Sequence, residues 1–319
     1  IVYQAKTADY APEVNRSRSL YVKWERTVYD KKDPNSAGHS RPSLWLVKEI
    51  FYPLTTPEAV TATYEGGEVL VGTVGSDEEM NTPLMLTDAA FWKVYQFRFL
   101  AGKPFTEADF QSGMKQAVIA KSVARRLFGG AENAIGKDIL VNFAAYTVCG
   151  VVDDVNRFCE FTWSEVYAPY TSNAIASEAE AGQTSGNNVI TILARSTDDF
   201  DAIRNEVARG VAQINTTLGD MELQLMGQPD NFRMQLNRKF ANQYENLNAN
   251  FWKYGIMILI ILLVPAINLS GLTNTRMRRR LEELGIRKAF GATRNELVWQ
   301  VLNENLVLTV MGGLLGLAL

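Results

Sequence analysis

Few residues in this sequence have the types and the spacing that enzyme or metal chemistry requires. The chain of 319 residues contains a single histidine, His39, and two cysteines, Cys149 and Cys159. One histidine disfavours a histidine-based metal site or a Ser-His-Asp triad, and two cysteines are too few for a zinc ribbon. The cysteines could form a disulfide in an oxidising compartment, or Cys149 could be a small core residue in the apolar run at 146–152.

The nearest approach to a phosphate-binding loop is the segment 130–138. It places five residues between Gly130 and Gly136, where the P-loop has four, and Asp138 stands where Ser or Thr would bind magnesium. We therefore interpret the segment as a turn and expect no ATP site in this chain. Acidic pairs such as Asp153-Asp154 are typical of solvated turns. Because no nucleophile–base pair or metal-ligand set is apparent, we expect the chain not to be an enzyme.

Charge is unevenly distributed along the chain. The net charge is −3, but residues 1–250 carry 24 Lys and Arg against 31 Asp and Glu, a net of −7. Residues 251–319 carry 8 against 4, a net of +4. An acidic body offers no basic face for a phosphate backbone, so we expect no nucleic-acid partner.

The C-terminal part of the chain has the hydropathy of membrane-spanning segments. Residues 254–275 contain no charged side chain, and as a helix they would extend about 33 Å, against about 30 Å for the hydrocarbon core of a bilayer. We predict a transmembrane helix there; the alternative is a buried helix of a large soluble protein. A second apolar run, 297–319, contains only one charge, Glu304, and predicts the start of a second span that the sequence cuts short.

The segment 276–296 between the two apolar runs is basic. Its first arginines, Arg276, Arg278, Arg279 and Arg280, form a positive-inside signal, which predicts a cytoplasmic location and places residues 1–250 across the membrane, in the periplasm of a bacterium. Glu282 and Glu283 precede the basic pair at 287–288 by four or five residues, which supports a helix. The apolar residues of this segment indicate a protein contact.

The body is predicted to be a mixed α/β structure of two lobes. Strand-like runs lie at 19–24, 59–64, 68–74, 117–120, 138–141, 146–152, 166–169 and 189–194. Helical patterns lie at 43–50, 88–97, 122–128 and 198–214, and residues 30–43 have the composition of a loop. Two strand–helix–strand units flank a β-rich middle, so we expect the second lobe to be inserted into the first. Residues 232–253 predict an uninterrupted stalk helix that continues into the first span.

The residues at 279–297 closely resemble a known family. They contain Glu283-Leu-Gly-Ile-Arg-Lys-Ala-Phe-Gly-Ala292, which matches the E-x-G-I-R-K-A-x-G-A segment of the FtsX/MacB family of ABC transporter permeases. Glu304 and the glycines at 312, 313 and 316 match the span that follows in that family. Segments of the body resemble the MacB-like periplasmic core in the same order: 91–109, 118–129, 134–137, 146–152 and 166–169.

The resemblance implies a division of the chain. A Porter-like lobe would comprise about 1–75 and 170–235, with a β-rich Sabre-like lobe at about 76–169 inserted and the stalk at 232–253. The spans at 254–275 and 297–319 would flank a cytoplasmic coupling segment, 276–296. In the family, a further transmembrane helix precedes the periplasmic region and each unit has four. The family's coupling helix docks on an ATPase, which implies contact through Glu282, Glu283, Gly285, Ile286, Arg287, Lys288, Gly291 and Ala292.

The resemblance further implies a permease subunit of the bacterial inner membrane that couples ATP hydrolysis on a separate ATPase subunit to periplasmic motion. ATP and Mg²⁺ would be bound by that ATPase, with no cofactor in this chain. Further partners would be a second permease unit, membrane lipid and, as one option, a periplasmic adaptor protein. The output would be efflux or the export of lipoproteins or peptides. A membrane-anchored periplasmic sensor is the main alternative, and an anchored periplasmic enzyme is less favoured.

Overall fold

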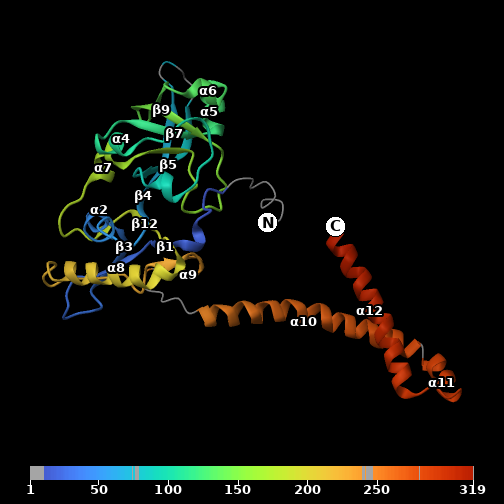
Figure 1. Cartoon of the computed structure of the whole chain (residues 1–319). Helices are drawn as coiled ribbons and strands as arrows, with labels where there is room; N and C mark the ends of the chain where they lie inside the picture. Colours follow the sequence, from blue (N-terminus) through green and yellow to red (C-terminus); the bar gives the residue numbers. More distant parts are fainter. Residues whose placement is uncertain are drawn as a thin grey trace. The chain divides into compact units, whose positions relative to one another are not determined.

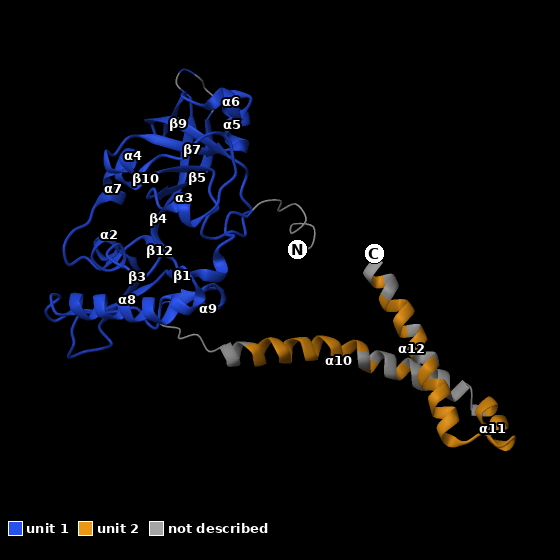
Figure 2. Ribbon diagram, viewed as in Figure 1, with its two compact units in different colours: residues 1–245 blue, residues 246–319 orange. Residues whose placement is uncertain are grey.

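The computed structural model describes residues 11–73, 75, 79–238, 241, 247–279 and 281–318. Contacts divide the chain into two compact units, unit 1 (residues 1–245) and unit 2 (residues 246–319), which Figure 2 shows in blue and orange. Unit 1 combines sheets and helices, whereas the described part of unit 2 is helical.

Unit 1 is built on a ten-stranded sheet, as far as its described residues show (Figure 1). Nine strands follow one another in the order β14 (Asp230–Asn231), β1 (Ser19–Val22), β12 (Asn188–Leu193), β4 (Ala59–Gly72), β5 (Glu79–Thr87), β10 (Val166–Pro169), β7 (Gln116–Ala120), β9 (Ala144–Val152) and β6 (Phe99–Gly102). Strand β8 (Asp138–Val141) pairs with β4 and β9. A smaller sheet has the order β11 (Ser185–Gly186), β3 (Ala37–Pro42), β2 (Glu25–Val28) and β13 (Glu222–Gln224).

The larger sheet contains an insertion. Strand β4 pairs on one side with β12 and on the other with β5, and the chain from β5 to β10 forms one end of the sheet before it returns to β12. The residues predicted to form two lobes therefore share one hydrogen-bonded sheet. The runs predicted at 59–64 and 68–74 are a single strand, β4, whose register shifts between Glu65 and Gly67. Gly67 has a φ of +72°, a backbone conformation that suits glycine at a bulge.

Both faces of this sheet are buried, because successive apolar side chains along its strands point to opposite faces. Leu20 and Ile119 belong to one buried cluster, while their chain neighbours Tyr21 and Val118 belong to another. Successive side chains of a strand point to opposite faces, so the two clusters lie on opposite sides of the sheet. The second cluster is rich in aromatic rings; Tyr21 stacks on Phe161 with ring centroids 4.4 Å apart.

The helices of unit 1 are short except for one. They are η1 (Arg16–Arg18), α2 (Leu44–Leu46), η2 (Val47–Phe51), α3 (Phe91–Val94), α4 (Glu107–Gln111), α5 (Lys121–Phe128), α6 (Ala131–Ala134), η3 (Tyr170–Ser172), α7 (Ala174–Ser177), η4 (Thr197–Asp199), α8 (Phe200–Asn215) and α9 (Phe232–Asn237). The long helix α8 follows a capping box of Ser196 and Asp199 and buries Ile203, Val207 and Ile214, as its period predicts. The helix predicted over 88–97 is limited to α3, and the predicted loop at 30–43 contains strand β3.

The uninterrupted stalk helix predicted over 232–253 is wrong at Arg238. Helix α9 ends at Asn237, and Arg238 has an extended backbone with ψ 106°. Its guanidinium is buried in an ion pair with Asp230 and donates to the carbonyl oxygen of Met226 over 3.1 Å. This buried anchor holds the chain out of the helical path. The stalk residues 239, 240 and 242–246 lie outside the described residues.

Unit 2 contains three helices in its described residues: α10 (Leu247–Arg279), α11 (Leu281–Ala289) and α12 (Arg294–Ala318). None of the helices in the described part of the chain meets the length and hydropathy needed to cross a membrane. In the predicted span 254–275, residues 266, 268–270 and 272–275 lie outside the described side chains. The same holds for residues 304, 305, 308, 314, 315 and 317–319 of the predicted span 297–319.

The two cysteines are free thiols, so the disulfide that the sequence left open is not formed. The Sγ atom of Cys149, on strand β9, donates to the carbonyl oxygen of Ala117 on the neighbouring strand β7 over 3.4 Å. Cys159 is buried outside the strands. Burial raises the pKa of the Cys149 thiol to about 12 and that of Cys159 to about 11, which makes both poor nucleophiles.

Candidate functional site

Helix α11 contains six of the eight residues that the sequence assigns to the coupling site. Glu282 and Glu283 lie in its first turn, and Arg287 and Lys288 in its last turn. Acidic groups at the start and basic groups at the end of a helix are favoured by its dipole. An Nη2 of Arg287 donates to Glu283 over 2.7 Å, but both side chains are about half exposed, so the pair itself adds only a few tenths of a kcal/mol.

A tight turn separates α11 from α12. Gly291 has a φ of +96°; its N–H donates to the carbonyl of Lys288, and the N–H of Ala292 donates to that of Arg287, each over 3.1 Å. This pattern is the Schellman motif, in which glycine avoids the cost of a left-handed backbone. The two remaining predicted residues, Gly291 and Ala292, are therefore the turn that ends α11.

Helix α12 begins at a capping box that the sequence interpretation missed. The backbone N–H and the hydroxyl of Thr293 donate to Glu296 over 2.8 and 2.9 Å, and the N–H of Glu296 donates back over 3.4 Å. These bonds hold the pKa of Glu296 below its ordinary value. The spacing Thr-x-x-Glu before an apolar run is a recognised signature of a helix start, so the signal was present in the sequence.

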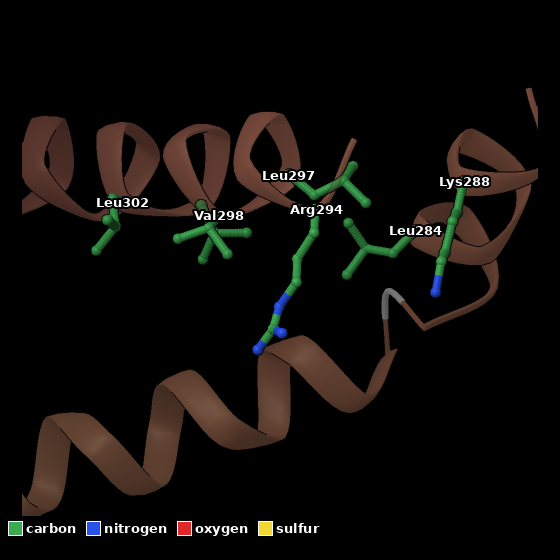
Figure 3. Close-up of a pocket in the computed structure, with 7 residues that line it drawn as sticks. Leu284, Lys288, Arg294, Leu297, Val298 and Leu302 are labelled. Carbon is green, nitrogen blue, oxygen red and sulfur yellow. The ribbon is translucent and has the colours of Figure 1, made fainter. Parts of the chain in front are cut away.

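Two faces of α11 differ in their surroundings. Leu284 and Lys288 line a groove of about 370 Å³ together with Arg294 and four apolar residues of α12, namely Leu297, Val298, Val301 and Leu302 (Figure 3). Ile286 and Phe290 lie on a different face, with 58% and 89% of their surfaces exposed. We call the pair Ile286 and Phe290 the apolar knob. An Nη1 of Arg287 donates to Gln300 over 3.1 Å, which ties α11 to α12.

For the four arginines of the predicted positive-inside signal, the structure describes at most the backbone. Arg276, Arg278 and Arg279 belong to the end of α10, but their side chains lie outside the described ones, as does the whole of Arg280.

Asp88 is a buried carboxylate of unit 1 that accepts several hydrogen bonds. Asp88 accepts hydrogen bonds from the hydroxyls of Thr61 and Tyr52 over 2.6 and 2.7 Å. It also accepts from the backbone N–H groups of Ala62 and Phe91, over 2.8 and 3.0 Å. Burial outweighs these bonds and raises the pKa of Asp88 to about 6. All four donors come from the protein itself, so the carboxylate acts as a structural hub that joins β4 to the start of α3. Among the described residues, no group of three or more His, Cys, Asp or Glu is placed to hold a metal ion.

Comparisons with known proteins divide the chain in a similar way. Residues 2–209 match the MacB-like periplasmic core domain, and residues 255–319 match the FtsX-like permease C-terminal region. The uncharacterised ABC transporter permease YknZ of Bacillus subtilis is 25% identical over 244 residues, which are 76% of this chain and 57% of that protein. The macrolide export ATP-binding/permease protein MacB of Wolinella succinogenes is 26% identical over 294 residues, which are 90% of this chain and 42% of that protein.

A solved structure has a similar fold. A domain of a protein assigned as a permease from Porphyromonas gingivalis gives a TM-score of 0.52 at 15% identity and covers 72% of this chain and 99% of that one. The chain spans about half the length of the two curated relatives, 57% and 42%. Since the core-domain match covers well over half of its residues, the chain belongs to the MacB/FtsX family of ABC transporter permeases, with a MacB-like periplasmic core domain followed by an FtsX-like permease region.

Proposed function

We propose that this chain is the permease subunit of a bacterial ABC transporter that transmits the work of ATP hydrolysis to its periplasmic domain. Residues 1–250 would lie in the periplasm, the helices at 254–275 and 297–319 would cross the inner membrane, and 276–296 would lie in the cytoplasm. The family membership and the uncharged run at 254–275 support this placement. The output would be efflux or the export of lipoproteins or peptides, in partnership with a second permease unit and, as one option, a periplasmic adaptor.

The observation that carries the proposal is the apolar knob on α11. An almost fully exposed phenylalanine beside an exposed isoleucine is unfavourable in water and is typical of a contact with another protein. Arg287, which follows Ile286 in the chain, donates to Glu283 and to Gln300 of α12, so α11 is linked to α12 beside the knob. We propose that this face docks on a separate ATPase subunit, which would bind ATP and Mg²⁺.

Gly285 gives an independent means of testing the contact. Beyond the backbone of its own helix, no described heavy atom lies within 4 Å of the point where a Cβ on this glycine would stand. Alanine is also a better helix former than glycine. Gly285→Ala should therefore leave α11 intact, so that a loss of binding would report a partner that approaches the glycine closely.

The test is co-purification of an ABC ATPase, identified by mass spectrometry, with the full-length protein extracted in detergent. We expect Phe290→Ala to reduce the recovered ATPase at least ten-fold, because an aromatic anchor of an interface contributes 2 kcal/mol or more. Phe158→Ala is the matched control, since Phe158 in unit 1 is 69% exposed and should not affect recovery.

The outcomes separate the alternatives. Recovery that is equal for wild type, Phe290→Ala and Gly285→Ala would contradict the assignment of the knob. Recovery of a kinase in place of an ATPase would favour a membrane-anchored sensor.

A further inference from the structure

The groove between α11 and α12 lies on a different face of α11 from the apolar knob, and its lining changes from charged to apolar along its length. Lys288 and Arg294 lie at its α11 end and extend to the same side in Figure 3, and Val298 and Leu302 continue from Arg294 along one face of α12. Among the described residues that line it, the groove therefore offers two cations first and apolar side chains beyond them. Its volume, about 370 Å³, lies within the range of sites that bind small ligands.

Neither cation is neutralised within the described part of unit 2. Glu283 pairs with Arg287, and Glu296 is engaged by Thr293 at the start of α12. Among the described residues no ion pair involves Lys288 or Arg294. A ligand complementary to the described lining therefore has a negative group for the two cations and an apolar part for α12.

We propose that this groove binds an anionic phospholipid of the inner leaflet, with the headgroup phosphate at Lys288 and Arg294 and an acyl chain along Val298 and Leu302. The assignment rests on the proposed function in so far as it places 276–296 at the cytoplasmic membrane surface. Basic residues in that position attract anionic lipids. Along the groove the two cations come first and the aliphatic residues follow, just as the charged headgroup of a phospholipid precedes its acyl chain.

The assignment gives the two faces of α11 different partners. Leu284 and Lys288 are one turn apart and face the groove, whereas the apolar knob lies on another face and is exposed. Residues two positions apart on a helix, such as Leu284 and Ile286, point to nearly opposite sides. A lipid in the groove would fill the space between α11 and α12 and hold the knob at a fixed height above the membrane.

The test is photo-crosslinking in vesicles that contain the full-length protein. The bilayer is phosphatidylcholine with a trace of either phosphatidylglycerol or phosphatidylcholine that carries a photoactivatable acyl chain, and labelled residues are mapped by mass spectrometry. We expect residues 284–302 to be labelled about ten-fold more by phosphatidylglycerol, since two interfacial cations favour an anionic lipid by at least this factor. The variant Lys288→Gln/Arg294→Gln should lower the label to the phosphatidylcholine level.

Arg287→Gln is the matched control, because it removes one charge from the same helix but from a residue that is paired with Glu283 and Gln300. It should retain the preference for phosphatidylglycerol. Equal labelling by the two lipids, or an unchanged label in the double variant, would overturn the proposal.

ATPase recovery separates this proposal from the proposed function. It is measured on Arg294→Gln alone, because Arg294 lines the groove but is not among the residues assigned to the ATPase contact. We expect Arg294→Gln to lower the lipid label and to retain the ATPase. Loss of both lipid label and ATPase in that variant would mean that the groove receives a segment of the ATPase, which would overturn the lipid assignment. A wild-type protein that is labelled by phosphatidylglycerol but recovers no ATPase would contradict the proposed function alone.

Discussion

At the scale of single residues, unit 1 contains buried carboxylates, each of which accepts hydrogen bonds from more than one element of the fold. Asp88 is 4% exposed and Glu25 is fully buried. Glu25 accepts from the hydroxyls of Thr27 and Ser185 over 2.7 and 3.0 Å. Burial raises the pKa of both carboxyls, so each binds a proton more tightly in the folded state than in the unfolded state. Stability that depends on such groups is present at low pH and is lost as the pH rises through the raised pKa.

Between pH 4 and pH 7, ionisation of Asp88 should lower the free energy of unfolding of unit 1. Its pKa rises from 3.8 to about 6 on folding, so the ionised form costs about 3 kcal/mol at pH 7. On lowering the pH from 7 to 5, the free energy of unfolding of the wild-type unit should increase by about 1 kcal/mol more than that of Asp88→Asn. Urea unfolding of residues 1–245 at the two pH values measures this difference. Identical pH dependence in the two proteins would show that Asp88 ionises normally.

At the scale of elements, the ends of helices are set by tertiary contacts as much as by sequence period. The stalk pattern at 232–253 is helical in spacing, yet the chain leaves the helix at Arg238, because the buried pair with Asp230 fixes its side chain in unit 1. No periodicity in the sequence reports such a pair. By contrast, α11 could be predicted from Glu283 and Arg287 and from Gly291, since its charge order and its cap are local. The groove beside it could not, because it depends on the turn that brings α12 against Leu284.

Breaking the buried pair should destabilise unit 1 far more than breaking an exposed pair. Asp230→Asn leaves the guanidinium of Arg238 buried beside a neutral amide, which costs about 3–5 kcal/mol. The same substitution in the pair of Asp201 and Arg204, 3.0 Å apart with Asp201 90% exposed, should cost less than about 1 kcal/mol. Urea unfolding of residues 1–245 compares the two variants. Similar losses of stability would mean that the Asp230–Arg238 pair is not the anchor at the end of α9.

At the scale of the whole molecule, most of the large sheet could be read from apolar runs such as 117–120 and 189–194, which are the strands β7 and β12. Strand β5 was missed because Pro83 and a charged start make it unlike a strand, and pairing with β4 and β10 stabilises it instead. Strand β3, with the sequence Ala-Gly-His-Ser-Arg-Pro, has no apolar alternation and is held by β2 and β11. Family membership followed from a ten-residue motif, whereas the faces of α11 became visible only in three dimensions.

The central proposal is that ATP binding and hydrolysis on a partner ATPase change the conformation of the periplasmic domain of this chain. It is tested most directly by amide hydrogen exchange in residues 11–238 of the full-length protein, purified with its ATPase and compared with and without ATP. We predict that ATP changes exchange in the periplasmic domain, most of all around α9 and the Asp230–Arg238 pair, and that Phe290→Ala abolishes the change. Unaltered exchange throughout residues 11–238, in a complex that retains and uses its ATPase, would contradict the account.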